Sequence, residues 1–134
     1  MKKDINFPEV KNITVAIVRK KNELGEYIWD VYLMNSNNHP IENILVVSHG
    51  YGQSNGEQVK TSVLRHFFEK LDSHSSMVTE SIDPSVFILN NEFGVTFYIN
   101  GEMYFKKFTF VSGSITEEYL RPIPVLRMEG ILHS

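Results

Sequence analysis

Several segments of this 134-residue chain alternate between hydrophobic and polar residues with a period of two, which predicts β-strands. The most informative segment is residues 93–111, where aromatic and β-branched residues lie on both sides of Asn100-Gly101. An Asn-Gly pair accepts positive φ at both central positions of a type I′ turn, whose twist matches that of two paired strands. We therefore expect a β-hairpin with its turn at residues 100 and 101.

The first part of the chain predicts a second hairpin and a further strand. Residues 11–18 and 27–35 both alternate in hydrophobicity, and a polar connection with one glycine joins them, as in an antiparallel hairpin. Residues 41–48 predict the next strand, and its nearly continuous apolar centre indicates burial on both faces or a central position in the sheet.

Residues 58–71 fit either a helix or a strand. Their apolar positions fall on one face of a helix with a period of 3.6 residues, and Arg65 and Glu69 have the spacing of an i,i+4 ion pair. β-branched residues in the first turns, the absence of a capping box and the surrounding strands argue for a strand. We favour the strand and keep the helix as the alternative.

The remaining segments are shorter. Residues 77–82 alternate and predict a strand, and an apolar segment at 86–89 is interrupted by Asn90-Asn91. The tail at 121–132 contains prolines, which exclude it from central pairing in a sheet but allow it at an edge.

About seven short strands separated by turn signals are typical of an antiparallel β-sandwich. We therefore predict an all-β, immunoglobulin-like antiparallel sandwich that forms a single domain over residues 1–134. The alternative is an α+β fold in which one helix at 58–71 packs on an antiparallel sheet. A chain of this length can bury a core large enough to fold without a disulfide.

Composition and charge limit the classes of function. The chain has no cysteine, which excludes disulfides, thiolate metal sites and a cysteine nucleophile. The net charge is −3 and the only basic clusters are Lys2-Lys3, Arg19-Lys20-Lys21 and Lys106-Lys107, so a nucleic acid partner is not expected. No apolar run is long enough to span a bilayer, and no apolar region follows Lys2-Lys3 as in a secretory signal. We expect a cytoplasmic protein without a membrane partner.

The segment 50–56 contains three glycines and follows a predicted strand. With a helix at 58–71, this would be the arrangement of a phosphate-binding loop, in which backbone amides face an anion. The candidate residues of such a small-molecule or anion site are Gly50, Tyr51, Gly52 and Gly56. Because neither further βαβ units nor a Gly-Lys-Ser/Thr sequence accompanies the loop, we favour a mobile hairpin loop and expect no cofactor.

Residues with catalytic or metal-binding chemistry lack the spacing that such sites require. The five histidines form no His-x-His or His-Glu-x-x-His unit, which leaves His49 and His66, on adjacent predicted strands, as the one pairing to consider. Ser48-His49 lacks the Gly-x-Ser-x-Gly elbow of a serine hydrolase. We therefore expect no catalytic residues, no metal site and a protein that is not an enzyme.

The aromatic residues of 93–111 exceed what one inner face of a small sandwich can hold. Either a second layer and the C-terminal tail cover the outer side of this hairpin, or an apolar patch is exposed and marks a partner site. An exposed patch would support self-association or the docking of a partner strand at a sheet edge. The residues of this candidate interaction surface are Tyr98, Tyr104, Phe105, Lys106 and Lys107.

Three segments also carry a resemblance to a known family: residues 60–69, 86–97 and 103–110. Together they resemble a small family of single-domain bacterial proteins of uncharacterised function, whose members often carry the label phenylalanyl-tRNA synthetase alpha subunit. The resemblance implies a β-rich fold over most of the chain and supplies no active-site residues. A class II synthetase subunit is far longer than this chain, and its ATP-binding arginine signatures have no counterpart here.

Three functions follow, in decreasing order of support. The first is a non-enzymatic protein-interaction domain whose partner is another protein or a second copy in a homodimer. The second is small-molecule or anion binding at residues 50–56. The third, suggested by the synthetase label alone, is an RNA-associated factor.

Overall fold

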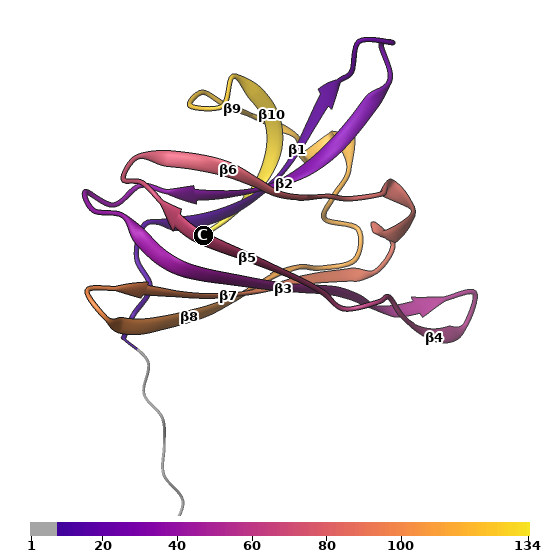
Figure 1. The fold of residues 1–134 in the computed structure, drawn as a ribbon. Helices are drawn as coiled ribbons and strands as arrows, with labels where there is room; N and C mark the ends of the chain where they lie inside the picture. The colour runs from indigo at the N-terminus through magenta and orange to yellow at the C-terminus, as the bar shows by residue number, and fades with distance from the viewer. Residues whose placement is uncertain (1–7) are drawn as a thin grey trace, which may run out of the picture.

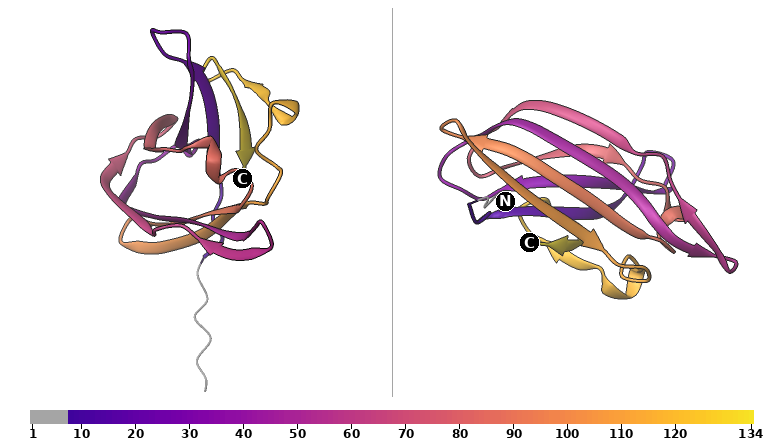
Figure 2. Two further views of the ribbon diagram at one scale, coloured as in Figure 1. Left: turned by 90° about the vertical axis from the view of Figure 1, so that its right-hand side faces the viewer. Right: turned by 90° about the horizontal axis from the view of Figure 1, so that it is seen from below.

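Two antiparallel β-sheets packed face to face make up the computed structural model of this protein, which describes residues 8–134 (Figure 1). Sheet A contains, in order, β6 (Ser75–Ser81), β2 (Tyr27–Asn35), β1 (Ile13–Lys21), β10 (Met128–His133) and β9 (Arg121–Ile123). Sheet B contains, in order, β4 (Glu57–Lys60), β3 (Ile41–Ser54), β7 (Asn90–Ile99) and β8 (Glu102–Phe110), and β5 (Leu64–Leu71) also pairs with β3. Figure 2 shows the two layers end-on and from below.

The predicted all-β antiparallel sandwich is confirmed. Residues 8–134 contain ten strands where about seven were expected, because residues 58–71 divide into two strands and the tail forms two more. Their only helical segments are the 3₁₀ turns η1 (Pro84–Val86) and η2 (Glu117–Tyr119). Within these residues no helix has the length and apolar character needed to cross a membrane. The predicted basic pair Lys2-Lys3 lies outside the described residues.

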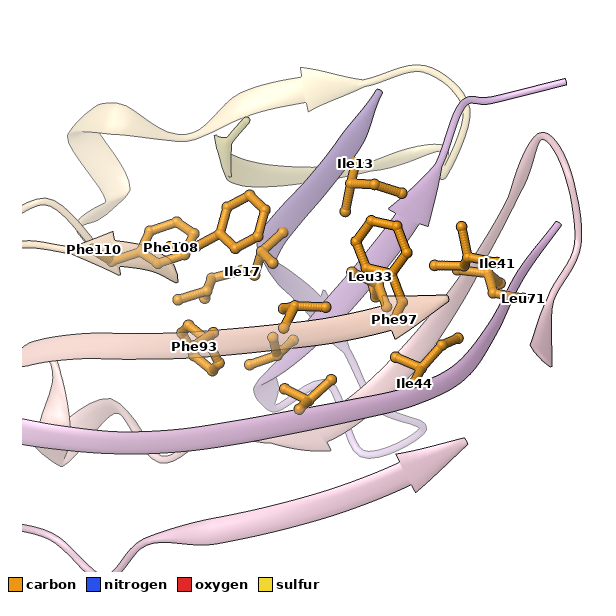
Figure 3. Close-up of a cluster of buried hydrophobic side chains, with 14 of the residues drawn as sticks. Ile13, Ile17, Leu33, Ile41, Ile44, Leu71, Phe93, Phe97, Phe108 and Phe110 are labelled. Atoms are coloured by element: carbon orange, nitrogen blue, oxygen red, sulfur yellow. The ribbon is translucent and has the colours of Figure 1, made fainter. Parts of the chain in front are cut away.

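Alternation along β7 and β8 supplies much of the core. Every second residue of β7 from Asn91 to Phe97 is buried, and on β8 Phe108 and Phe110 are buried as well. These phenylalanines pack against aliphatic side chains of β1 and β2, among them Ile17 and Leu33 (Figure 3). Burying one large apolar side chain contributes about 1.5–3 kcal/mol to folding, so this seam between the sheets is the main source of stability.

The two predicted hairpins are confirmed. β1 pairs with β2 in continuous register from Ile13↔Asn35 to Lys21↔Tyr27. β7 and β8 pair from Asn91↔Phe110 to Ile99↔Glu102. At the turn between them Asn100 has φ 49° and Gly101 has φ 79°, the two positive values that a type I′ turn requires.

Residues 58–71 are strands, so the helix alternative is wrong. β4 and β5 both pair with the same edge of β3, which is 14 residues long and otherwise would leave that edge open. Phe67 is exposed on the outer face, whereas the next residue, Phe68, packs against the core. The apolar residues of this segment have helical spacing because they lie on both faces of the strand, with Phe67 outward and Phe68 inward.

The C-terminal tail forms the edge of sheet A, and two asparagines form the start of β7. Pro122 lies in β9 at the edge of sheet A, as expected for the proline-containing tail, and β10 pairs with β1. The apolar segment at 86–89 ends at Asn90 and Asn91, as predicted, and these asparagines begin β7. The Asn91 side-chain amide donates to the carbonyls of Val86 and Leu89, and these bonds hold the irregular 84–89 segment against the start of the strand.

Candidate functional site

A pocket of about 280 Å³ lies between the two sheets where β6 ends and η1 begins. β5 and β6, the edge strands of the two sheets, lie one above the other on this side of the sandwich (Figure 1). The polar residues that line the pocket include Ser48, Thr61, Ser62, Glu80, Asp83 and Asn91. Its apolar walls are formed by Leu64, Ile82, Val86 and Phe93.

An interruption in the edge pairing of β3 forms one side of this pocket. Residues 61–63 connect β4 to β5 without pairing in either strand, and Thr61 is tied to Gly50 instead. The Gly50 amide donates to Thr61 Oγ1 over 2.7 Å, and the Thr61 amide donates to the Gly50 carbonyl over 2.9 Å. A Cβ at position 50 would lie 3.1 Å from Thr61 Cγ2, so this close approach favours glycine.

A β-bulge places Glu80 in the pocket. Val31 pairs with Glu80, but the next residue of β2, Tyr32, pairs with Val78, so Thr79 is an extra residue on β6. Such an insertion changes which face the following side chain points to. Glu80 therefore shares the core-facing side of sheet A with the buried Val31, and its side chain is only 8% exposed.

Two side chains of sheet B meet the Glu80 carboxylate. Ser48 Oγ donates a hydrogen bond to Glu80 Oε1 over 2.7 Å, and His66 Nε2 lies 3.4 Å from the same oxygen. The imidazole contact does not have hydrogen-bond geometry, so His66 Nε2 is buried without a hydrogen-bond partner. Burying a carboxylate is costly unless it is paired and hydrogen-bonded, and this one receives a single hydroxyl and a poorly aligned imidazole.

This arrangement is not a catalytic triad. In a serine hydrolase the imidazole accepts the proton of the serine, whereas here the serine hydroxyl donates to the carboxylate and the histidine lies on the other side. Ser48 is also only 4% exposed. Ser48 and His49 face opposite sides of sheet B, because Ser48 pairs with the buried Phe93 and His49 with Glu92. The geometry thus fits binding and not nucleophilic attack.

A second carboxylate lies at the pocket. Asp83 is exposed, and its Oδ1 accepts a hydrogen bond from the Ser85 amide over 2.8 Å at the start of η1. This backbone hydrogen bond, reinforced by the side chain of Ser85, lowers the pKa of Asp83 below its ordinary value. The pocket entrance therefore carries a negative charge across the neutral pH range.

The outer face of sheet B carries a separate polar group of residues. Glu92 lies between His49 and Lys107, with Oε2 3.8 Å from His49 Nδ1 and Oε1 3.9 Å from Lys107 Nζ. Tyr51 stacks on His49 with ring centroids 5.4 Å apart. These four residues line a shallow groove that is open to solvent.

An apolar row crosses the same outer face. Leu45 pairs with Phe67 on one side and with Thr96 on the other, and Thr96 pairs with Phe105. Because paired residues point to the same side, these four side chains form one line across β5, β3, β7 and β8. Phe67 is 61% exposed, and Leu45 and Phe105 are also exposed. We call this line, together with the exposed Met103 beside it, the apolar row.

The five residues predicted as one interaction surface lie on two faces, so that prediction is corrected. Tyr98, Phe105 and Lys107 are on the outer face of sheet B. Tyr104 stacks on the buried Phe97 with centroids 5.3 Å apart, and Lys106 pairs with the buried Val95. The alternation of β8 separates these neighbours, and the aromatic surplus is shared between core and surface.

The glycine segment is part of a hairpin and not a phosphate-binding loop. β3 continues to Ser54, so Gly50, Tyr51 and Gly52 are strand residues, and only Gly56 lies in the turn to β4. No helix follows, so the anion site that required one is not formed. Gly50 lines the pocket and Tyr51 the outer groove, and the structure thus divides these candidates between two sites.

The histidines lie apart from one another. His66 faces the space between the sheets and His49 the outer face, so the two do not form a pair. In the part of the chain that the structure describes, no three His, Asp or Glu side chains come close enough to hold a metal ion.

The fold and its pocket define an all-β antiparallel sandwich with a polar cavity between its edge strands. No protein-family model, no curated protein and no solved structure matches the chain. The resemblance to the small bacterial family therefore stays a prediction.

Proposed function

We propose that the protein is a non-enzymatic interaction domain that associates with a second copy of itself through the outer face of sheet B. The observation that carries this proposal is the apolar row, in which Leu45 and Phe67 are exposed on the paired strands β3 and β5, and Phe105 is exposed on β8 beyond Thr96. Single exposed apolar residues are common on monomers, but a contiguous set on one face is typical of a contact site. With neighbouring strands about 4.8 Å apart, the row spans about 14 Å.

Charges on this face support a second copy as the partner. Arg65 and Glu69 share the outer side of β5 with Phe67, and Glu92 and Lys107 lie on the outer side of β7 and β8. The face thus carries both signs. A two-fold contact brings the same patch of two subunits together, and a patch with both signs can pair with itself without net repulsion.

The test is sedimentation velocity of the wild type and Phe67→Ser over a wide concentration range. We expect the wild type to approach the dimer mass as concentration rises. Phe67→Ser should raise the dissociation constant about tenfold or more, because each of the two subunits loses its phenylalanine ring from the contact. Leu24→Ser is the matched control, since Leu24 is 83% exposed in the β1–β2 connection, away from sheet B. A wild type that stays monomeric, or a variant that dimerises equally well, would refute the proposal.

The other two functions receive less support. The loop-based anion site lacks its helix, as described above. RNA association needs a basic face. On the outer face of sheet B, Lys60 and Lys107 line one groove, but Lys107 contacts the acidic Glu92 there.

A further inference from the structure

We infer that the pocket between the sheets binds a small primary ammonium compound with a short apolar body. The ammonium group would lie against the Glu80 carboxylate and the apolar body against the walls of the pocket. This site goes beyond the proposed function, which uses only the opposite face of sheet B. Three features of the pocket favour such a ligand: the incomplete hydrogen bonding of Glu80, the negative charge of the lining and the small, partly apolar volume.

Glu80 is a buried carboxylate without a full set of partners. A carboxylate can accept about four hydrogen bonds. Within residues 8–134, Oε1 accepts one from Ser48 and lies 3.4 Å from His66, and no hydrogen bond to Oε2 is present. The side chain is 92% shielded from solvent, since only 8% of it is exposed. An ammonium group supplies the positive charge and the N–H donors that this carboxylate lacks.

A second acceptor points into the pocket. The side-chain amide nitrogen of Asn91 is used by the carbonyls of Val86 and Leu89, which fixes the orientation of the amide group. Its Oδ1 consequently lies on the Gly50 side, 3.4 Å from where a Cβ of that residue would be. Asn91 is buried, and its Oδ1 accepts no hydrogen bond from the described residues. The pocket thus offers acceptors, which suits a ligand that only donates.

The charge of the pocket selects a cation. Glu80 and Asp83 line it, and no lysine or arginine is among the lining residues. The depressed pKa of Asp83 keeps the second carboxylate ionised. A phosphate or carboxylate ligand would therefore be repelled, in contrast to the anion predicted for the glycine segment.

The shape of the pocket sets the size of the ligand. Its volume of about 280 Å³ is near the lower end of the range for small-molecule sites. Leu64, Ile82, Val86 and Phe93 give it apolar walls, which favour a short hydrocarbon over a strongly hydrated group. Thr61 Oγ1 accepts a hydrogen bond from the Gly50 amide and donates one to the Ser62 carbonyl. This hydroxyl therefore does not need a hydrogen bond from the ligand.

The test uses three probes of matched length: butylammonium, the uncharged 1-butanol and the anionic butyrate. Amide shifts of Gly50, Leu64 and Asn91 are followed by heteronuclear NMR during titration of the full chain at constant ionic strength. We expect saturable shifts with butylammonium, at least tenfold weaker binding of 1-butanol, and no shift with butyrate. Equal binding of butylammonium and 1-butanol, or no saturable shift with butylammonium, would overturn the assignment.

Two carboxylate variants locate the site. Glu80→Gln keeps the shape of the side chain and removes its charge, and we expect it to weaken butylammonium binding at least tenfold. The matched control is Glu92→Gln, a strand carboxylate on the outer face of sheet B, which should bind butylammonium like the wild type. Wild-type affinity in Glu80→Gln would refute the role of this carboxylate. The comparison of the three probes on the wild type decides the question even where Glu80→Gln does not fold.

Discussion

At the scale of single residues, Glu80 shows how one inserted residue creates a site. With regular alternation, Glu80 would lie on the same side of β6 as Val78, which is exposed. The extra residue Thr79 changes this phase and turns the carboxylate inward, where it meets Ser48 from the other sheet. The Thr79 hydroxyl donates to the Val31 carbonyl over 3.3 Å, which secures the bulge on β2.

No local sequence pattern predicts this placement of Glu80. The alternation of residues 77–82 predicts a regular strand, whereas the bulge at Thr79 places Val78 and Glu80 on opposite faces. His66 was considered only as a partner of His49. Its contact with Glu80 joins two strands that no local spacing rule relates, since β5 and β6 belong to different sheets.

Gly130 is required by a close approach of backbones. A Cβ at this position would lie 2.7 Å from the Ile17 carbonyl oxygen and 3.2 Å from Val18 Cα, so backbone atoms of β1 would have to move. We expect Gly130→Ala to lower the free energy of unfolding by about 1–3 kcal/mol, the usual cost of overpacking. Urea denaturation measures this change. Glu129→Ala is the control, because its side chain is 57% exposed and should have little effect. Equal stabilities of the two variants would contradict the clash.

At the scale of elements, the strands that the sequence predicts without an alternative are those whose signals are local, and the strand favoured at 58–71 is confirmed as well. The β7–β8 hairpin is set by its Asn-Gly turn and the β1–β2 hairpin by two alternating segments around a polar connection. Residues 58–71 are different, because the open edge of the distant β3 decides their structure. A pairing of this kind is a tertiary effect that overrides the helical spacing of a single segment.

The turn between β7 and β8 gives a test at this scale. Gly101 has φ 79°, a conformation that costs a residue with a Cβ roughly 1–2 kcal/mol. We expect Gly101→Val to lower the free energy of unfolding by about 1–2 kcal/mol, because valine has a Cβ and its branching there restricts the backbone further. Asn100→Gly, at the neighbouring position with φ 49°, should be tolerated with little loss. Chemical denaturation of both variants provides the measurement, and a wild-type stability of Gly101→Val would show that the turn is not type I′ in solution.

Strand alternation also explains why two candidate surfaces share the same elements. On β3, the Ser48 side chain points to Glu80 in the pocket and the His49 side chain to Glu92 on the outer face, and on β5, His66 faces inward and Phe67 outward. The side chains of adjacent residues such as Ser48 and His49 therefore point to different sites, so a pair of neighbours in the sequence does not form one site here. Gly50 and Phe105 are candidates that the sequence predicts, but their assignment to one face or the other depends on registers set by partner strands.

At the scale of the whole molecule, the core joins the sheets into one structural unit. Phenylalanines of β7 and β8 pack against Ile17 and Leu33 of sheet A, and Trp29 of sheet A contacts Phe87 edge-on with ring centroids 4.9 Å apart. No cluster of buried residues belongs to sheet B alone among those described, since the larger cluster draws on both sheets. Neither sheet can thus keep its inner face buried without the other.

This shared core predicts that the two sheets unfold together. Trp29 is the only tryptophan and reports on sheet A, whereas far-UV circular dichroism reports on all strands. We expect Ile44→Val, in β3 of sheet B, to cost about 0.5–1.5 kcal/mol and to shift the fluorescence and dichroism transitions by the same amount. Leu24→Val, at an exposed position, should shift neither. A substitution in sheet B can change the unfolding of the Trp29 region only through the packing between the two sheets. If Ile44→Val moved the dichroism transition but left the Trp29 fluorescence transition unchanged, the sheets would unfold separately.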